Sequence, residues 1–215
     1  MKYSIIIPCY NAEESIFRRC LDSIKNQTLQ PYEVICIDDC SPYDTPQIAK
    51  EYGFKYIRHE KNLNNGGARN TGIREAIGDY LVFVNDDDYI LPETLEEIDK
   101  VNNGEDLILI GFRAFGTWNY EFIPSDETTP YYTKLGWNGE PFHIVNRKFI
   151  IDNNLFEEEN VVFADIKWAK DVEDATKTYT YVPKPLYQFQ TGLDTSLTTK
   201  VMKGRLNEKN NILSK

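Results

Sequence analysis

The chain has 215 residues, of which 41% are hydrophobic. That length supports one sizeable buried core and is too short for two ordinary domains. Its 24 Lys and Arg are outnumbered by 34 Asp and Glu, giving a formal net charge of −10, which excludes a nucleic-acid-binding protein that relies on a basic surface. The longest apolar runs fall well short of the ~20 residues that a membrane-spanning helix needs, so an integral membrane protein is also excluded.

The N-terminus and the cysteines indicate the compartment. The apolar stretch before Pro8 is too short for the core of a signal peptide. The four cysteines all lie within the first 40 residues and lack the paired C-x-x-C spacing of a zinc site. We therefore expect a cytoplasmic protein whose thiols are reduced.

Through residue 110, short β-rich apolar runs alternate with amphipathic stretches, which is typical of a parallel sheet with helices on both faces. The predicted strands of this half span residues 3–7, 33–37, 54–58, 80–84 and 107–110. The predicted helices span residues 14–26, 45–52, 68–77 and 92–101. Residues 62–67 are rich in Asn and Gly and are expected to form a loop.

Periodicity is weaker in the second half of the chain. Residues 112–140 are rich in aromatic residues, Pro and Gly, and we expect an irregular segment there, with a hairpin as the alternative. Two further helices are predicted at 147–153 and 165–175, and a strand at 179–182. Residues 202–215 are expected to form a polar tail with weak helical character. The predicted fold is a single α/β domain with a Rossmann-like, mostly parallel central sheet.

Polar motifs follow three of the predicted strands. They are Pro8-Cys9-Tyr10-Asn11, Asp38-Asp39 and Asn85-Asp86-Asp87-Asp88. Because a parallel sheet places its binding crevice beyond the carboxyl ends of its strands, these motifs are expected to converge on one site.

The run Asp86-Asp87-Asp88 places three carboxylates side by side. Their mutual repulsion is unfavourable unless protonation, hydrogen bonds or a cation offsets it. Carboxylate oxygens suit Mg²⁺ or Mn²⁺, and Mg²⁺ commonly completes its shell with water and substrate phosphate. We therefore predict a divalent cation that binds a diphosphate. The alternative is a solvated acidic turn before the helix that begins near Pro92.

Four motifs, taken together and in this order, resemble the family 2 glycosyltransferases. They are Ser4-Ile5-Ile6-Ile7-Pro8-Cys9-Tyr10-Asn11, Asp38-Asp39-Cys40-Ser41, Gly67-Ala68-Arg69-Asn70-Thr71-Gly72-Ile73 and Phe83-Val84-Asn85-Asp86-Asp87-Asp88-Tyr89. The resemblance covers residues 3 to about 110, and beyond them only Asp165 and the segment 183–187. It implies a GT-A fold, a nucleotide-diphospho-sugar donor, Mn²⁺ or Mg²⁺, and inversion at the anomeric carbon. Residues 1–110 would then form the nucleotide-sugar-binding half, and residues 111–215 the acceptor-side half with the tail.

The resemblance also implies roles for the residues of the first two motifs. It places Pro8, Tyr10 and Asn11 around the nucleotide, with Tyr10 against the base, and core packing of Tyr10 is the alternative. Asp38 and Asp39 belong to the same site, and Asp39 would accept a hydrogen bond from a base imide N–H. Uracil offers that N–H where cytosine offers only an acceptor, which favours a UDP-sugar. The alternative for both carboxylates is a turn-forming role.

The resemblance also implies roles for Arg69 and for the acidic motif. Arg69 would approach the diphosphate or support the loop, and a surface ion pair is its alternative. The metal ligand of the family corresponds to Asp87, with Asp86 and Asp88 as further candidates. Asn85 stands where the family usually has an Asp that faces the ribose or sugar, so metal affinity or the donor contact is altered, and Asp86 compensates in part.

For the general base of an inverting transfer we select Asp165, which opens the helix predicted at 165–175. Ala164 replaces the Glu that often precedes this Asp in the family, and a helix N-cap is the alternative role. On the acceptor side, the candidates are Trp137, His143 and Arg147, and the acceptor is a glycan, a lipid-linked precursor or a protein, with peripheral membrane association as an option. His59 receives no role. Because of Asn85 and Ala164, the competing function is a catalytically impaired sugar-nucleotide-binding protein of the same fold.

Overall fold

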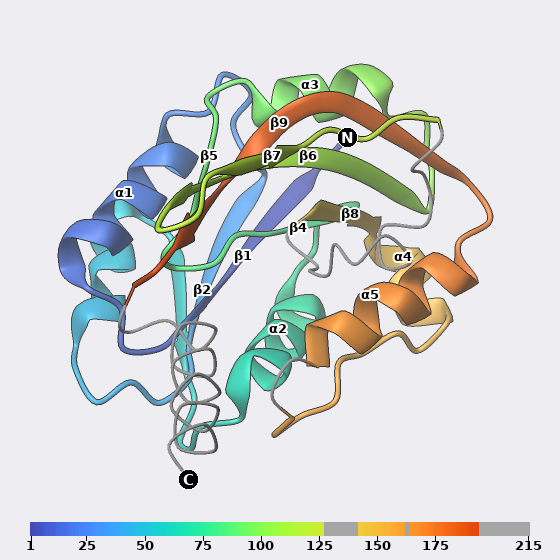
Figure 1. Ribbon diagram of the computed structural model, residues 1–215. Helices are drawn as coiled ribbons and strands as arrows, with labels where there is room; N and C mark the ends of the chain where they lie inside the picture. Colours follow the sequence, from blue (N-terminus) through green and yellow to red (C-terminus); the bar gives the residue numbers. More distant parts are fainter. Residues whose placement is uncertain (127–141, 162–163, 194–215) are drawn as a thin grey trace, which may run out of the picture.

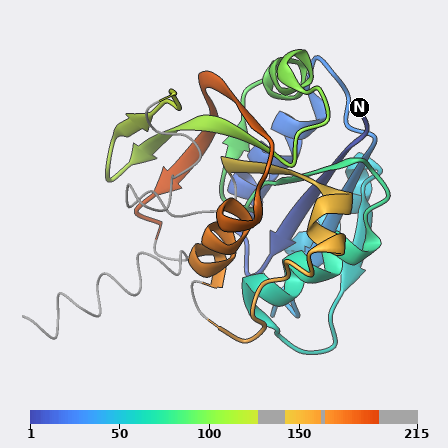
Figure 2. The ribbon, with the colours of Figure 1, turned by 90° about the vertical axis from the view of Figure 1, so that its right-hand side faces the viewer.

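The computed structural model describes residues 1–126, 142–161 and 164–193, which form a mixed α/β fold around one curled sheet (Figures 1 and 2). In chain order the strands are β1 (Tyr3–Cys9), β2 (Glu33–Asp38), β3 (Lys55–Arg58), β4 (Tyr80–Phe83), β5 (Tyr89–Ile90), β6 (Leu107–Gly116), β7 (Tyr120–Phe122), β8 (His143–Asn146) and β9 (Tyr179–Thr191). The helices are α1 (Glu14–Lys25), the 3₁₀ helix η1 (Thr45–Tyr52), α2 (Asn64–Glu75), α3 (Thr94–Val101), α4 (Arg147–Asp152) and α5 (Ala164–Ala175). Within these described ranges, the structure contains no helix with the length and apolar character needed to cross a bilayer.

The sheet has the strand order β3-β2-β1-β4-β8-β6-β9-β5, with β7 paired to β6. Strands β3, β2, β1 and β4 run parallel to one another. Strand β8 is antiparallel to both β4 and β6, and β6 is parallel to β9. The predicted α/β fold with a parallel central sheet is confirmed, and the neighbouring carboxyl ends of β2, β1 and β4 define one edge.

Strand β1 contains a proline near its carboxyl end, in the middle of the sheet. Val84 N donates to Ile6 O at 3.0 Å, so Ile6 directs its backbone polar groups toward β4. Pro8, two residues later, faces the same side, but β4 ends at Phe83, opposite Ile6. The missing N–H of Pro8 therefore removes no hydrogen bond of the sheet. The proline marks the point where β4 no longer pairs with β1.

Helix α2 begins earlier than predicted. The sequence favours a loop over residues 62–67, whereas the structure places Gly66 and Gly67 in the first turn of α2. A Cβ on Gly66 would lie 2.7 Å from Glu158 O. This glycine is therefore needed for close packing of two segments, and not for the left-handed backbone that a loop would require.

The strands of the second half depart furthest from the prediction. β6 and β9 continue well beyond residues 110 and 182 and pair along their length, with a register shift where Ile110 pairs with Val182 and Gly111 with Pro185. The prolines at 183 and 185 suggest a strand end, but a bulge of this kind accommodates them. Strand β7 forms a hairpin with β6, in line with the alternative for 112–140, whereas β8 was not predicted. Residues 127–141 and the predicted tail 202–215 lie outside the described residues.

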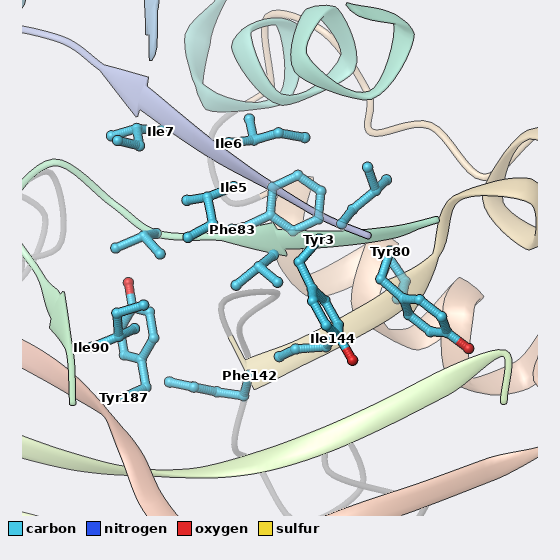
Figure 3. Close-up of a cluster of buried hydrophobic side chains, with 14 of the residues drawn as sticks. Tyr3, Ile5, Ile6, Ile7, Tyr80, Phe83, Ile90, Phe142, Ile144 and Tyr187 are labelled. Atoms are coloured by element: carbon cyan, nitrogen blue, oxygen red, sulfur yellow. The ribbon is translucent and has the colours of Figure 1, made fainter. Parts of the chain in front are cut away.

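The core joins the two halves of the chain. Figure 3 shows Tyr3, Ile5 and Phe83 of the parallel strands near Phe142, Ile144 and Tyr187 of the later segments, all of them buried. Tyr187 of β9 lies edge-on to Phe142, with ring centroids 5.4 Å apart. The hydroxyl of Tyr187 donates to Asp88 Oδ2 at 2.7 Å. The acidic motif after β4 is therefore anchored directly to the core.

Candidate active site

Three loops meet at the carboxyl ends of β2, β1 and β4. Asp39 N donates to Cys9 O at 2.9 Å, which joins the β2 loop to the end of β1. On the other side of β1, Tyr10 N donates to Asp86 Oδ2 at 3.0 Å, which joins β1 to the acidic motif. Asn11 N also donates to Ser41 Oγ at 3.2 Å. The three motifs selected from the sequence thus form one continuous site.

Tyr10 lies on the surface of this site, with 52% of its area exposed, which rules out the core-packing alternative. The next residue, Asn11, has a positive φ of 56°, a conformation that Asn adopts more readily than most residues. The chain therefore turns sharply after Tyr10. Pro8 is buried within β1, whereas the exposed Tyr10 ring is available to stack on a planar ligand.

Asp38 and Asp39 have different environments, although they are adjacent. Asp38 has no exposed surface and accepts hydrogen bonds from Ser41 N, Tyr56 Oη and Arg58 Nη1. Burial alone would raise the pKa of Asp38, but these hydrogen bonds and the Arg58 charge outweigh it and hold the pKa below its usual value. The nucleotide contact predicted for Asp38 is therefore corrected: its carboxylate forms the turn after β2.

In the described residues, the protein donates hydrogen bonds to one of the two carboxylate oxygens of Asp39. Its Oδ1 accepts hydrogen bonds from Leu63 N and from His59 Nδ1, both at 2.8 Å. Asn62 Nδ2 donates to the Asp39 carbonyl at 3.1 Å. Across the described part of the chain, Oδ2 of Asp39 accepts no hydrogen bond. The carboxylate, which is only 3% exposed, is thus oriented by the protein, and its second oxygen takes no hydrogen bond from the described residues.

Asp88 is more deeply buried than the two aspartates that precede it, Asp86 and Asp87. Asp88 is fully buried, and it accepts hydrogen bonds from Tyr187 Oη, Asn85 Nδ2 and Gln190 N. Its pKa is raised well above the usual value by burial and by the neighbouring Asp87 charge. Both of its oxygens are used to attach the loop to β9, so Asp88 is corrected from a candidate metal ligand to an anchor of the loop.

Asp86 and Asp87 remain available for a ligand. Burial, followed by repulsion from Asp87, raises the pKa of Asp86 to about 8. Burial raises the pKa of Asp87 to about 6, although the Arg19 charge opposes the shift. No group of three His, Cys, Asp or Glu side chains in the described ranges could hold a metal unaided. A half-buried carboxylate pair of this kind suits a hard cation that takes its remaining ligands from a phosphate-bearing substrate and water.

These raised pKa values predict how stability depends on pH without a cation. A carboxyl group whose pKa is higher in the folded chain binds protons preferentially in that state, so its ionisation destabilises the fold. Between about pH 5 and pH 8, the Tm of the protein in EDTA should therefore fall by a few degrees. Asp86→Asn should flatten this profile. A wild-type Tm that stays level or rises across the window would contradict the assignment.

Arginine side chains support the acidic loop from within. Arg69, only 2% exposed, donates from Nη2 to Asn85 Oδ1 at 2.9 Å and faces Glu157 with its other amino group. Of the roles predicted for Arg69, loop support is the one that its contacts show. Arg19, which the sequence did not single out, donates to the Asp87 carbonyl at 2.8 Å and lies over the Tyr89 ring. Asn85 is held between Arg69 and Asp88.

Asp165 lies on the same side of the molecule as this network. It is the second residue of α5, which places it in the first turn and not at the N-cap. Burial raises the pKa of Glu157, and the charge of the nearby Asp165 acts in the same direction. Glu157 in turn contacts Arg69. The candidate base therefore lies near Glu157, which is linked to the acidic loop through Arg69 and Asn85.

The predicted acceptor residues do not gather at this site. His143 has no exposed surface, and its Nε2 lies 3.0 Å from Glu173 Oε1, so the acceptor contact predicted for it is corrected to a buried pairing of β8 with α5. Arg147 N donates to Asp79 O at the start of β4, which is the opposite end of this strand from the acidic motif. The acceptor contact predicted for Arg147 is therefore also corrected, because this residue lies away from the acidic motif. Trp137 lies outside the described residues.

The fold matches solved glycosyltransferases. The crystal structure of residues 1–349 of TarS from Staphylococcus aureus superposes with a TM-score of 0.75 at 25% sequence identity, covering 88% of this chain and 60% of that one. Its complex with UDP-GlcNAc gives a TM-score of 0.79 at 24% identity, covering 93% and 61%. These likenesses confirm the predicted GT-A fold.

The sequence relatives lead to the same family. The chain is 32% identical over 183 residues to the uncharacterized glycosyltransferase EpsJ of Bacillus subtilis, covering 78% of this chain and 53% of EpsJ. It is 31% identical over 212 residues to the uncharacterized glycosyltransferase YibD of Escherichia coli, covering 87% and 61%. The chain thus spans between half and two thirds of the length of these relatives. The sequence model of glycosyl transferase family 2 matches residues 4–165, and the chain belongs to this family.

Proposed function

We propose that this chain transfers a sugar from a UDP-sugar to an acceptor hydroxyl, with inversion at the anomeric carbon and with the assistance of Mn²⁺ or Mg²⁺. One observation carries the proposal. The backbone of Cys9 and Tyr10 is hydrogen-bonded to Asp39 on one side and to Asp86 on the other. A group suited to read a base and a group suited to hold a cation therefore lie on either side of one strand end, which is the arrangement that a nucleoside diphosphate requires.

The donor base follows from Asp39. Its Oδ2 is available as an acceptor, and the imide N–H of uracil is a matching donor, whereas cytosine presents an acceptor at the same position. The exposed ring of Tyr10 would stack on the base. TarS was solved with UDP-GlcNAc, which makes UDP-GlcNAc the first donor to test. The acceptor would be a hydroxyl of a glycan, a lipid-linked precursor or a protein.

In the proposed transfer, the acceptor oxygen attacks the anomeric carbon, and the bond from that carbon to the diphosphate oxygen breaks with its electron pair. The Asp165 carboxylate takes the hydroxyl proton as the new bond forms. A divalent cation held by Asp87, with Asp86 beside it, would supply Lewis-acid stabilisation of the departing diphosphate. Arg69 and Arg19 keep the loop that carries these carboxylates in place.

The experiment that tests this proposal compares UDP, GDP, CDP and dTDP by thermal shift, each with and without Mn²⁺. We expect the largest increase in Tm with UDP, and we expect this increase to depend on Mn²⁺, because a ligand that binds only the folded state stabilises it. Equal shifts with all four nucleotides, or a shift with UDP that is indifferent to Mn²⁺, would contradict the roles of Asp39 and Asp87.

A turnover assay then separates an enzyme from a catalytically impaired binding protein. The latter is suggested by Ala164, which is only 6% exposed and leaves Asp165 as the carboxylate at the start of α5. Release of UDP from UDP-GlcNAc or another UDP-sugar in the presence of Mn²⁺ supports the transferase. Metal-dependent binding of UDP, combined with no release from any donor and acceptor offered, would favour the binding protein.

A further inference from the structure

His59 has no role in the sequence pattern, yet its ring contacts Asp39 of the candidate site. It directly follows β3, and its backbone N donates to Asp38 O at 2.9 Å. Its ring lies between the β2 loop and α2, with Nδ1 2.8 Å from Asp39 Oδ1 and Nε2 2.9 Å from Thr71 Oγ1. The imidazole therefore bridges Asp39 and a helix of the scaffold.

The hydrogen on Nδ1 can be assigned from its partner. An ionised carboxylate only accepts hydrogen bonds, so Nδ1 must donate to Asp39. Thr71 Oγ1 also lies 3.1 Å from Gly67 O, to which its hydroxyl can donate. If it does, Nε2 donates to Thr71 and the ring is an imidazolium. If the hydroxyl turns toward the ring, Nε2 accepts and the ring is neutral. Both arrangements keep the hydrogen on Nδ1.

This donor has a consequence for Asp39. Its Oδ1 takes two hydrogen bonds, from His59 Nδ1 and from Leu63 N. Two donors on one oxygen fix the plane of the Asp39 carboxylate and the direction in which Oδ2 points. An ionised Asp39 accepts from the uracil imide, whereas only a protonated Asp39 could donate to the ring nitrogen of cytosine. The contact made by His59 thus bears on which base the site accepts.

We propose that His59 is a specificity-determining positioning residue, which holds Asp39 as an oriented carboxylate so that its Oδ2 selects uracil over cytosine. The proposal rests on the proposed function, because it takes Asp39 as the group that reads the base. His59 itself need not contact the nucleotide. Its effect is transmitted through one hydrogen bond, and the ring is held in place for this purpose by Thr71.

The test measures the Kd values of UDP and CDP, with Mn²⁺ present, for the wild type and three variants. His59→Leu removes the donor, and we expect UDP to bind roughly tenfold more weakly, as for the loss of one charge-assisted hydrogen bond. CDP should bind no more weakly than before, so the preference for UDP falls by the same factor. His59→Asn should retain most of the preference, because its Nδ2 lies close to the position of Nδ1.

Thr71→Val is the matched control, because it removes the partner of Nε2 and leaves the contact between His59 and Asp39. We expect it to keep the preference for UDP. If His59→Leu lowers the Tm but leaves the ratio of the two Kd values unchanged, His59 is only structural and the inference is overturned, while the proposed function stands. A wild type that does not prefer UDP over CDP would instead overturn the base assignment of the proposed function.

A second measurement does not depend on nucleotide binding. Nitrogen NMR of the histidine side chains in the free protein reports which ring nitrogens carry hydrogen. We expect Nδ1 of His59 to be protonated near neutral pH. A ring protonated only at Nε2 would overturn the inference, whatever the nucleotide affinities are.

Discussion

Replacing Asp87 with Asn should lower turnover by about 10²–10³-fold, because Lewis-acid stabilisation of a leaving group contributes several kcal/mol. Within the part of the chain that the structure describes, its side chain accepts a hydrogen bond only from its own backbone N–H, which leaves it the acidic residue of the loop most available to a cation. The variant should keep the affinity of the wild type for UMP, which lacks the diphosphate. UDP release from UDP-GlcNAc with Mn²⁺ measures the first effect, and calorimetry with UMP measures the second.

Asp86→Asn is the matched comparison for this variant. Asp86 already accepts a hydrogen bond from Tyr10 N, and an amide oxygen can accept the same bond. We therefore expect a smaller loss of turnover than in Asp87→Asn. Near-full turnover of Asp87→Asn would remove Asp87 from the metal site, and equal losses in both variants would mean that the two carboxylates hold the cation together.

The position of the site could be predicted from the sequence because it depends on topology. Asp39 and Asp87 are 48 positions apart, but each follows a strand that pairs with β1 in parallel. Parallel neighbours end at one edge, so the convergence of their loops needs no knowledge of side-chain contacts. The four-motif resemblance, confirmed by the family match over residues 4–165, added the expected chemistry to that position.

The orientation of individual side chains could not be predicted in this way. Successive residues in extended backbone point to opposite sides, and the sequence alone does not say which of Asp38 and Asp39 points inward. The inward direction of Asp88 depends on Tyr187, which is 99 positions away. The burial of His143 depends on its pairing with Glu173 of α5, and no local sequence pattern links the two residues. Long-range pairing decided each of these cases.

The other large effect is expected at Asp165. Asp165→Asn removes the proposed base but keeps a side chain of almost the same size in the first turn of α5. General-base catalysis contributes roughly 10²–10⁴-fold, and turnover should fall by a factor in this range. The KM for the donor should not change, because Asp165 is proposed to act on the acceptor hydroxyl. Steady-state release of UDP from UDP-GlcNAc, measured over a range of donor concentrations with Mn²⁺, separates the two parameters.

Asp171→Asn is the control on the same helix. The Asp171 side chain is 40% exposed and pairs with Lys167 at 2.6 Å, and an ion pair on the surface of a helix contributes little to stability. It should therefore leave both kcat and KM unchanged. Ala164 offers no second carboxylate at the start of α5, and Glu157 is buried against Arg69, so neither residue is placed to replace Asp165. Turnover of Asp165→Asn close to that of Asp171→Asn would show that the acceptor proton goes elsewhere, even if donor binding is as proposed.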